Sequence, residues 1–507
     1  FTYHVFQYAE FTVENGRLLQ GGPDKNTLEG VAAYTDSPIR AEFACSDPTI
    51  QRLFDMADWT TVGNLHGLPT DCPGRERCGW TGDAHLLAPF ALRRYEGTAL
   101  WSKYQDDIVT SAARGGQMLH FGKDFGDREV RMKAAGLPTM IAPGKRTSGA
   151  ATPDWGSAII FVPWDIYRFT GDARPLERHY ASFVQWVEHL RGVAQDNILN
   201  SGLGDWCTPW RFGGPPPGEA RAYYARIVPE LSTACYWRSA DTLARIAVLL
   251  GRKADAEKYR RLADEIGATY WARYYDPASG GFSDQTVNAI AVHWGLAPEE
   301  KRAGVSAALA RQVAADGDHF YTGVFGLPSL FPALADHGHD DTVARIIANP
   351  QPPGFRTLLA RGATTYWEVW PTSSDPAEPY DRSKSHPFQG AWAVWCIDGI
   401  AGIRVDDTLP AFRRFRLAPR MVRELEWARC REQTPMGPVE SSWRRRGNAL
   451  EWQVEIPPGA EAEIIAPGQI RELTATSADT AAPRTAGDRV TLTAGRYTLQ
   501  VELESRR

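Results

Sequence analysis

The stretch Phe183-Val184-Gln185-Trp186-Val187-Glu188-His189-Leu190 shows the pattern that decides the fold. Its apolar residues recur at positions i, i+3, i+4 and i+7, which is the spacing of one face of an α-helix. The same spacing recurs in further stretches, at residues 50–57, 243–250, 259–266 and 327–334. Amphipathic helices of ordinary length are therefore predicted between about residues 45 and 404.

Long connections rich in Gly, Pro and Trp join these predicted helices, at residues 68–84, 137–156, 202–218 and 362–386. Loops of this length in a compact domain are usually functional. About a dozen helices, joined alternately by short turns and by long loops, indicate a toroid of helical hairpins, an (α/α)6 barrel whose long loops gather at one end. No sequence repeat of fixed period is visible, which disfavours a solenoid.

Both ends of the chain change to the two-residue period of β-strands. Residues 1–44 alternate in short stretches, with a turn signal at residues 14–16, and we expect them to be the remnant of a preceding β-module or a β-segment packed on the helical region. The chain begins at Phe1, as a piece of a longer polypeptide would. From residue 405 onward the alternation returns, for example at Leu450, Trp452 and Val454, and predicts a C-terminal antiparallel β-sandwich over residues 405–507. The expected fold is thus mainly α, with a catalytic barrel over residues 45–404.

Composition excludes several classes of protein. Apolar residues make up 43% of the 507 residues and charged ones 23%, as in ordinary globular proteins, so a disordered chain is excluded. The net charge is -5 and no block of Lys and Arg stands out, which argues against nucleic acid as a partner. No apolar run approaches the ~20 residues that a bilayer crossing needs, so we expect no membrane association through a spanning helix.

The seven cysteines are odd in number and contain no Cys-x-x-Cys pair, so neither a disulfide framework nor a zinc site is expected. This favours a reduced, cytoplasmic setting, with secretion as the alternative. The histidines are scattered without metal-ligand spacing, so we predict no catalytic metal and no cofactor. A structural calcium ion stays open, although no EF-hand pattern is present.

The densest group of chemically active residues is Asp71-Cys72-Pro73-Gly74-Arg75-Glu76-Arg77-Cys78-Gly79-Trp80-Thr81-Gly82-Asp83. Its prolines and glycines exclude a regular helix or strand, so the loop itself must bring the charges together. Such a cluster has two interpretations, an ion-pair network that pins the loop or a ligand site. The chain also contains 18 Trp, 18 Tyr and 20 Phe. Aromatic faces beside carboxylates suit sugar rings, which favours the ligand site.

The string Asp-Cys-Pro-x-Arg-Glu-Arg-x-Gly-Trp-x-Gly-Asp over residues 71–83 resembles the signature loop of the bacterial α-L-rhamnosidases of glycoside hydrolase family 78. The resemblance continues through residues 153–158, 204–206, 326–327 and 362–370, and it ends at residues 401–403. It spans almost the whole helical region, and it implies a helical barrel followed by a C-terminal β-sandwich.

The resemblance also implies roles for individual residues. Glu76, in the first loop, matches the general acid of the family, and Glu368, in the Gly-Ala-Thr-Thr-x-Trp-Glu string, matches the general base. The other positions match residues that hold the terminal rhamnose or line further subsites: Asp71, Arg75, Trp80, Asp83, Trp155, Trp206 and His386. The implied partner is a rhamnosylated small-molecule glycoside or oligosaccharide.

The chemistry of glycoside hydrolysis also calls for two carboxyl groups such as those of Glu76 and Glu368. Cleavage of a glycoside needs one carboxyl to protonate the leaving oxygen and one carboxylate on the opposite face of the sugar. Inversion requires room for a water between them, about 6.5–9.5 Å between the carboxyl groups. Glu76 and Glu368 are far apart in the chain, so only a closed fold can bring them together. An aromatic-lined pocket also suits the methyl group of a 6-deoxy sugar.

Two other functions stay open. A lyase that eliminates across a rhamnose–uronate bond would use a similar sugar pocket, with its base placed for the uronate C5 proton. A catalytically silent sugar-binding protein would retain the pocket without turnover. The short form Arg75-Glu76-Arg77 and Ser385, where Asn is common, depart from the family pattern and leave the aglycone side undefined. A homodimer is also left open.

Overall fold

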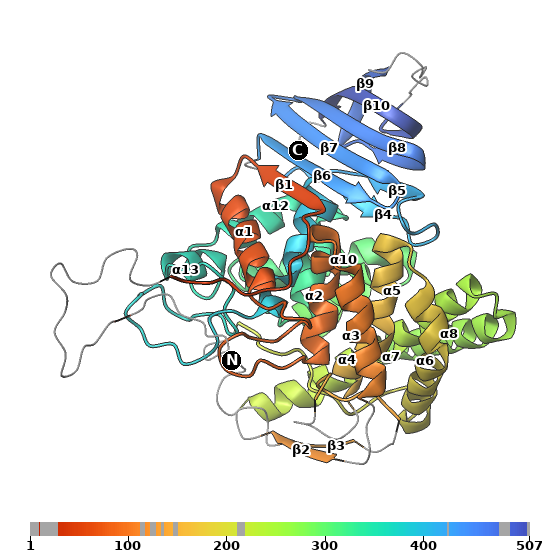
Figure 1. The fold of residues 1–507 in the computed structure, drawn as a ribbon. Coiled ribbons are helices and arrows are strands. Elements are labelled where there is room, and N and C mark those ends of the chain that lie inside the picture. The colour runs from red at the N-terminus through yellow and green to blue at the C-terminus, as the bar shows by residue number, and fades with distance from the viewer. Residues whose placement is uncertain are drawn as a thin grey trace.

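The computed structural model describes Glu10 and residues 29–111, 117–121, 128–132, 136–144, 151–209, 219–422, 425–475 and 487–503. A helical body and one large β-sheet make up this part of the chain, with the sheet at one end of the body (Figure 1). Apart from Glu10, the strands and the turn expected within residues 1–28 lie outside the described residues.

The helical body follows the periodicity of the sequence. A 3-10 helix over Pro387–Ala393 and a π-helical turn over Cys396–Ile400 end it. The α-helices are α1 (Pro48–Val62), α2 (Thr81–Arg94), α3 (Thr98–Thr110), α4 (Pro153–Gly156), α5 (Ala158–Thr170), α6 (Arg174–Val193), α7 (Ala220–Leu249), α8 (Lys253–Tyr274), α9 (Gln285–His293), α10 (Glu299–Ala315), α11 (Leu327–Ala335), α12 (Asp340–Ala348) and α13 (Phe355–Ala360).

Helix α1 illustrates how local sequence sets these boundaries. Asp47 caps its N-terminus, because Oδ1 accepts hydrogen bonds from the backbone N–H groups of Thr49 at 2.7 Å and Ile50 at 2.9 Å. Pro48 occupies the first helical position, where its missing N–H costs nothing. The predicted apolar face of α1, including Ile50, is buried, and so is that of α6 around Trp186. Burial of these faces confirms the predicted helices.

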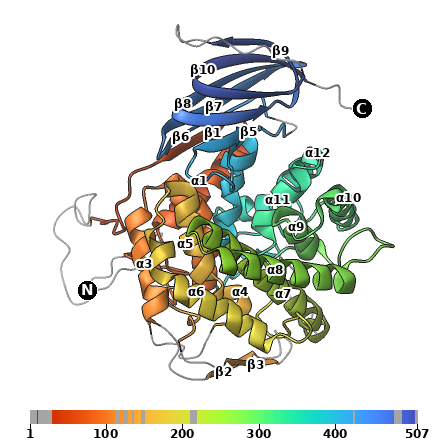
Figure 2. The same cartoon turned by 90° about the vertical axis from the view of Figure 1, so that its right-hand side faces the viewer.

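The large sheet follows the helical body in the sequence and curls strongly (Figure 2). Its main path runs β1-β6-β7-β8-β10-β9, while β5 pairs with both β4 and β8. These pairings are antiparallel except that of β5 with β8, which is parallel. The strands are β1 (Ala41–Cys45), β4 (Ile403–Val405), β5 (Arg414–Leu417), β6 (Trp427–Thr434), β7 (Gly437–Arg446), β8 (Ala449–Ile465), β9 (Gly468–Ala475) and β10 (Arg489–Leu503).

Strand β1 precedes the helical body yet belongs to the sheet that comes after it. It pairs antiparallel with β6, with Ala41 opposite Glu432 and Cys45 opposite Ala428. Arg40 reinforces the junction, since its Nε donates to the carbonyl of Gln433 at 3.0 Å. A strand that precedes the helical body in the sequence therefore links that body to the large sheet.

One element was not indicated by the helical periodicity. Strands β2 (Gln117–Phe121) and β3 (Arg128–Met132) form a two-stranded antiparallel sheet inside the helical region. This hairpin lies at the end of the body away from the large sheet (Figure 1). A separate observation concerns membranes: within the described ranges, no helix is both long enough and apolar enough to cross a bilayer.

Candidate active site

The loop over residues 71–80, which precedes α2, is folded back on itself by hydrogen bonds of its first residue, Asp71. The backbone N–H of Asp71 donates to the carbonyl of Cys78 at 2.9 Å, and the Cys78 N–H donates to Asp71 Oδ1 at 2.8 Å. Asp71 is buried, so this side chain fixes the two ends of the loop together. The prediction that the loop folds back on itself to gather its charges is confirmed.

Glu76 lies at the tip of this loop, and several neighbours fix its position. The Trp80 indole donates to Glu76 Oε2 at 2.8 Å. Two sulfurs hold its backbone: Cys72 Sγ accepts from the Glu76 N–H, and the Cys78 thiol donates to the Glu76 carbonyl, both at 3.2 Å. The next residue, Arg77, has a φ of 54°, a left-handed conformation that side-chain-bearing residues rarely adopt. Strain of this kind often marks functional loops.

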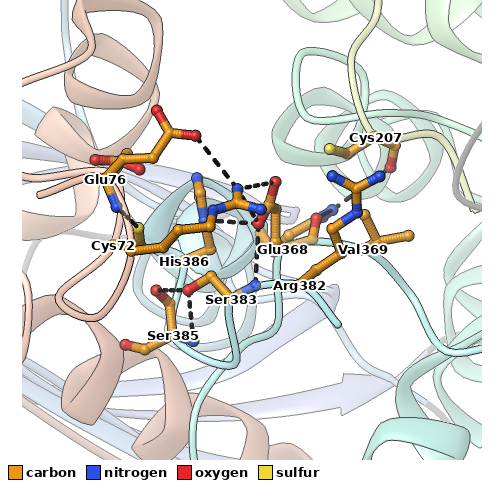
Figure 3. Close-up of polar contacts among 12 residues, drawn as sticks. Cys72, Glu76, Cys207, Glu368, Val369, Arg382, Ser383, Ser385 and His386 are labelled. Carbon is orange, nitrogen blue, oxygen red and sulfur yellow. Dashed lines mark hydrogen bonds and ion pairs between the residues drawn. The ribbon is translucent and has the colours of Figure 1, made fainter. Parts of the chain in front are cut away.

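Glu368 lies on the segment that follows α13, and it is held on both sides. Its backbone N–H donates to the Ser383 carbonyl at 2.8 Å, while the Ser383 N–H donates to Glu368 Oε2 at 3.1 Å. The Gln389 side chain donates to the Glu368 carbonyl at 3.0 Å. The carboxylate is thereby aimed toward the loop of Glu76 while Glu368 stays only 8% exposed (Figure 3).

Arg75 joins the two glutamates. Its Nη2 lies 2.7 Å from Glu368 Oε2 and 3.3 Å from Glu76 Oε1. Since one nitrogen touches both carboxylates, these two distances limit the separation of those oxygens to at most about 6 Å. Two carboxylates from remote parts of the sequence thus face one small gap, which the guanidinium now fills.

A second buried pair lies beside this gap. His386 Nε2 is 3.1 Å from Asp83 Oδ1, and His386 Nδ1 is 3.8 Å from Glu368 Oε2. Burial alone would lower the pKa of His386, but the hydrogen bond and charge of Asp83, with the charges of Glu368 and Asp71, raise it above its usual value. Burial raises the pKa of Asp71 to about 6, against the opposing charge of His386. The site therefore mixes charges whose protonation depends on one another.

The aromatic side of the site comes from the short helix α4 and from the loop that contains Trp206. The rings of Trp155 and Trp206 meet edge to face at 6.3 Å, and Trp155 also contacts Phe325 at 5.3 Å. Trp155 is buried, and it packs so closely on Gly82 that a Cβ there would lie 2.4 Å from the ring. Trp206 is half-buried, and the carbonyl of the next residue, Cys207, accepts from Gln389 at 3.5 Å.

These contacts connect the predicted site residues to one another. Asp71, Arg75, Glu76, Trp80 and Asp83 come from one loop and the start of α2. Glu368 and His386, about 300 residues later in the sequence, contact Arg75 and Asp83 directly. Trp155 contacts this group through Gly82. Trp206 reaches it through Cys207 and Gln389, which also binds Glu368.

Asp205 supports the aromatic side and was not predicted as a site residue. Its carboxylate accepts from the backbone N–H groups of Gly323 at 2.6 Å and Phe325 at 2.9 Å, and from the Thr286 hydroxyl. Burial raises its pKa to about 7. The signal available in the sequence was its position between Gly204 and Trp206. Ser383 and Gln389, which orient Glu368, carry no comparable sequence signal.

Several buried polar atoms meet no hydrogen-bond partner among the described residues: Asp71 Oδ2, His386 Nδ1 and Trp155 Nε1. Buried polar atoms are nearly always paired, so atoms of this kind indicate where a polar ligand binds. Asp71, Cys72 and His386 also offer ligand atoms within 4.8 Å of one another, which a metal ion could use. Hydrogen-bond acceptors such as Asp71 Oδ2 and donors such as the Trp155 indole N–H can equally well bind sugar hydroxyls, which both donate and accept.

Two family models match the chain. One, described as the bacterial alpha-L-rhamnosidase 6 hairpin glycosidase domain, matches residues 39–400, and a bacterial alpha-L-rhamnosidase C-terminal domain matches residues 402–480. The chain belongs to the bacterial α-L-rhamnosidase family. The resemblance seen in the loop over residues 71–83 is thereby confirmed.

Individual rhamnosidases resemble the chain over nearly all of its length. An α-L-rhamnosidase from Formosa agariphila is 28% identical over 478 residues, which cover 92% of this chain and 47% of that protein. The structure of α-L-rhamnosidase from Dictyoglumus thermophilum matches with a TM-score of 0.80 and 26% identity, covering 95% of this chain and 52% of that one. A Streptomyces avermitilis α-L-rhamnosidase complexed with L-rhamnose gives a TM-score of 0.79 and 25% identity, covering 95% and 44%. The chain thus spans about half the length of the curated relatives it matches.

Proposed function

We propose that this chain is the catalytic part of an inverting α-L-rhamnosidase, which releases terminal α-linked L-rhamnose from glycosides or oligosaccharides. The observation that carries the proposal is the pair of carboxylates of Glu76 and Glu368, which face one gap across Arg75. Family membership and the relatives that are themselves α-L-rhamnosidases support the choice of sugar.

In this proposal Glu76 is the general acid and Glu368 the general base. Glu76 donates a proton to the glycosidic oxygen as the bond from that oxygen to C1 breaks. Glu368 takes a proton from the water whose oxygen attacks C1 from the opposite face, so the products are rhamnose of inverted configuration and the free alcohol. The hydrogen bond from the Trp80 indole supports the placement of Glu76, and the contacts of Ser383 support that of Glu368.

Arg75 has to leave the gap before a sugar and a water can enter it. Its side chain is 40% exposed, so the guanidinium can swing toward solvent and still pair with Glu76 or Glu368. A gap that accommodates a guanidinium nitrogen at hydrogen-bond distance from both carboxylates also has room for a water oxygen between them. The limit of about 6 Å between these oxygens lies between the separations of about 5–5.5 Å in retaining and about 6.5–9.5 Å in inverting glycosidases, so the configuration of the released sugar decides between the two mechanisms.

The remaining site residues would hold the sugar. Asp71, Asp83, His386 and Arg75 supply charged groups for ring hydroxyls, and the absence of a hydrogen-bond partner for Asp71 Oδ2 and His386 Nδ1 among the described residues supports that role. Trp80, Trp155 and Trp206 would form the apolar wall against the sugar ring and its methyl group. We further propose that residues 45–404 form an (α/α)6 barrel and residues 405–507 a β-sandwich. The seven free thiols support a reduced, cytoplasmic setting.

The reaction is tested with p-nitrophenyl α-L-rhamnoside, with the anomeric configuration of the product followed by NMR. We expect free L-rhamnose whose first-formed anomer is inverted. A first-formed anomer of retained configuration would contradict inversion. An unsaturated product that absorbs in the ultraviolet from a rhamnose–uronate substrate would favour the lyase, and binding without turnover would favour the silent sugar-binding protein.

Glu76→Gln tests the role of general acid, and Glu368→Gln tests the role of general base. Each should lower kcat by about 10²–10⁴-fold, the usual contribution of a general acid or base. Glu378→Gln is the matched control, because Glu378 lies on the same segment as Glu368 but pairs with Arg361 at 3.2 Å and is exposed. Parent-like activity of Glu76→Gln on a substrate with a poor leaving group would remove Glu76 from the acid role.

A further inference from the structure

A cavity lined by none of the predicted site residues lies on the side of the β4–β5 hairpin. It has a volume of about 390 Å³ and is lined by side chains of α2, α5, α7, α9, α11, β4 and β5. We call it the back chamber, and its lining includes His85, Arg168, Arg238, His293, Trp294 and Arg404. Its size is that of a site for a small molecule, since such sites measure about 300–1,000 Å³.

A layer of aromatic rings separates the back chamber from the candidate active site. Phe325 contacts Trp155 of the active site at 5.3 Å and His85 of the back chamber at 5.6 Å. His85 also contacts Phe161 at 5.4 Å. Phe325 and His85 therefore lie between Trp155 and the back chamber, and none of the residues proposed for the hydrolysis lines this chamber.

Most charged groups of the back chamber neutralise one another. The arginines in its wall pair with carboxylates in this way: Arg168 with Asp165 and Asp407, Arg245 with Asp241, Arg404 with Asp336, and Arg416 with Glu463. Arg238 is different, because it has no ion pair or hydrogen bond to any residue that the structure describes. Asp165 and Asp407, whose charges act on Arg238, are both bound by Arg168.

Two aromatic rings hold the Arg238 guanidinium in place. Its central carbon lies 4.4 Å from the centroid of Phe161 and 4.6 Å from that of Trp294, as in cation–π contacts. Rings cover the faces of a flat guanidinium but leave the N–H groups at its edge for an acceptor. Burial lowers the pKa of Arg238, which an anion beside it would offset. The histidines of the wall add no charge near neutral pH, because burial lowers the pKa of His85 and His293 to about 4.

We propose that the back chamber is a binding site for a small oxyanion, a phosphate, sulfate or carboxylate group, held at the N–H edge of Arg238. Oxyanions match the planar fork of a guanidinium, which binds them through paired hydrogen bonds. The ring of Trp294, which lies beside Arg238 and lines the chamber, would contact any apolar part of the ligand.

Isothermal titration of the full chain with inorganic phosphate, sulfate and D-glucuronate, at matched ionic strength, tests the proposal. We expect saturable binding of at least one of these anions, and the strongest one identifies whether the inorganic ion or the carboxylate is preferred. Arg238→Gln should weaken that binding roughly tenfold or more, because charge-assisted hydrogen bonds are lost. Arg416→Gln is the control, since Arg416 lines the same chamber but already pairs with Glu463 at 3.0 Å.

No saturable binding in the parent chain, or equal binding by Arg238→Gln, would overturn the proposal. Should Arg238→Gln not fold, crystals of the parent chain soaked in selenate locate the anion directly. A peak beside Arg238 supports the site, and peaks only elsewhere contradict it. Rhamnosidase activity is not the readout, so failure here leaves the proposed function untouched.

Discussion

Replacing Gly82 with alanine tests whether the position of Trp155 controls catalysis. The new Cβ would lie 2.4 Å from the Trp155 ring, where ordinary contact is 3.4–4 Å, so the ring or the start of α2 must move by about 1 Å. Trp155 is packed between Trp206 and Phe325 and cannot move alone. A displacement of about 1 Å in a substrate-positioning group can cost about 10²-fold in rate.

For Gly82→Ala we therefore expect kcat/KM on p-nitrophenyl α-L-rhamnoside to fall by about 10²-fold. Overpacking should also lower the free energy of unfolding, measured in urea, by about 1–3 kcal/mol. Gly304→Ala is the control, because a Cβ on Gly304, in the interior of α10, meets nothing within 4 Å and should slightly stabilise the helix. Parent-like kinetics together with parent-like unfolding of Gly82→Ala would refute the reasoning.

Three further changes have defined outcomes. Burial raises the pKa of Glu230 from 4.5 to about 7, so folding favours its protonated form. The parent should therefore lose up to about 3 kcal/mol of unfolding free energy as the pH rises from about 4.5 to 7. Denaturant titrations of Glu230→Gln should not show this loss. Arg93→Ala leaves buried Glu432 uncompensated and should cost about 3–5 kcal/mol by the same measurement; a change under about 1 kcal/mol would contradict this. Asp83→Asn removes the group that most raises the pKa of His386, so NMR titration should give a lower His386 pKa than in the parent, and an unchanged value would argue against the pair.

Helices α1, α6, α7, α8 and α11 were predictable because each one buries a stripe that its own sequence carries, whereas α4 lies within the predicted connection over residues 137–156. The stripe at Ile50, Leu53 and Phe54 becomes the buried face of α1, and no distant residue is needed to recognise it. The two-stranded sheet of β2 and β3 was not predicted, and neither was the pairing of β1 with β6. Strand pairing joins residues far apart in the chain, and a single sequence does not record which strands become neighbours.

The candidate site was predictable in its residue types and less so in its geometry. The resemblance over residues 71–83 pointed to Glu76, and the structure places it near Glu368. The position of Arg75 between both carboxylates follows from the folded loop alone. The hydrogen bonds of Cys72 and Cys78 to the Glu76 backbone also follow only from the folded loop. Cysteine spacing in a sequence indicates disulfides and metal sites, not weak hydrogen bonds of this kind.

The place of β1 at the border of the large sheet has a practical consequence for dissecting the molecule. A fragment that starts at Ile403 would retain β6 but lack its neighbour, and the backbone groups that β1 covers would be bare. An uncovered strand of this kind recruits other chains and promotes aggregation. Expression trials of the C-terminal portion should therefore graft residues 40–46 back on through a linker.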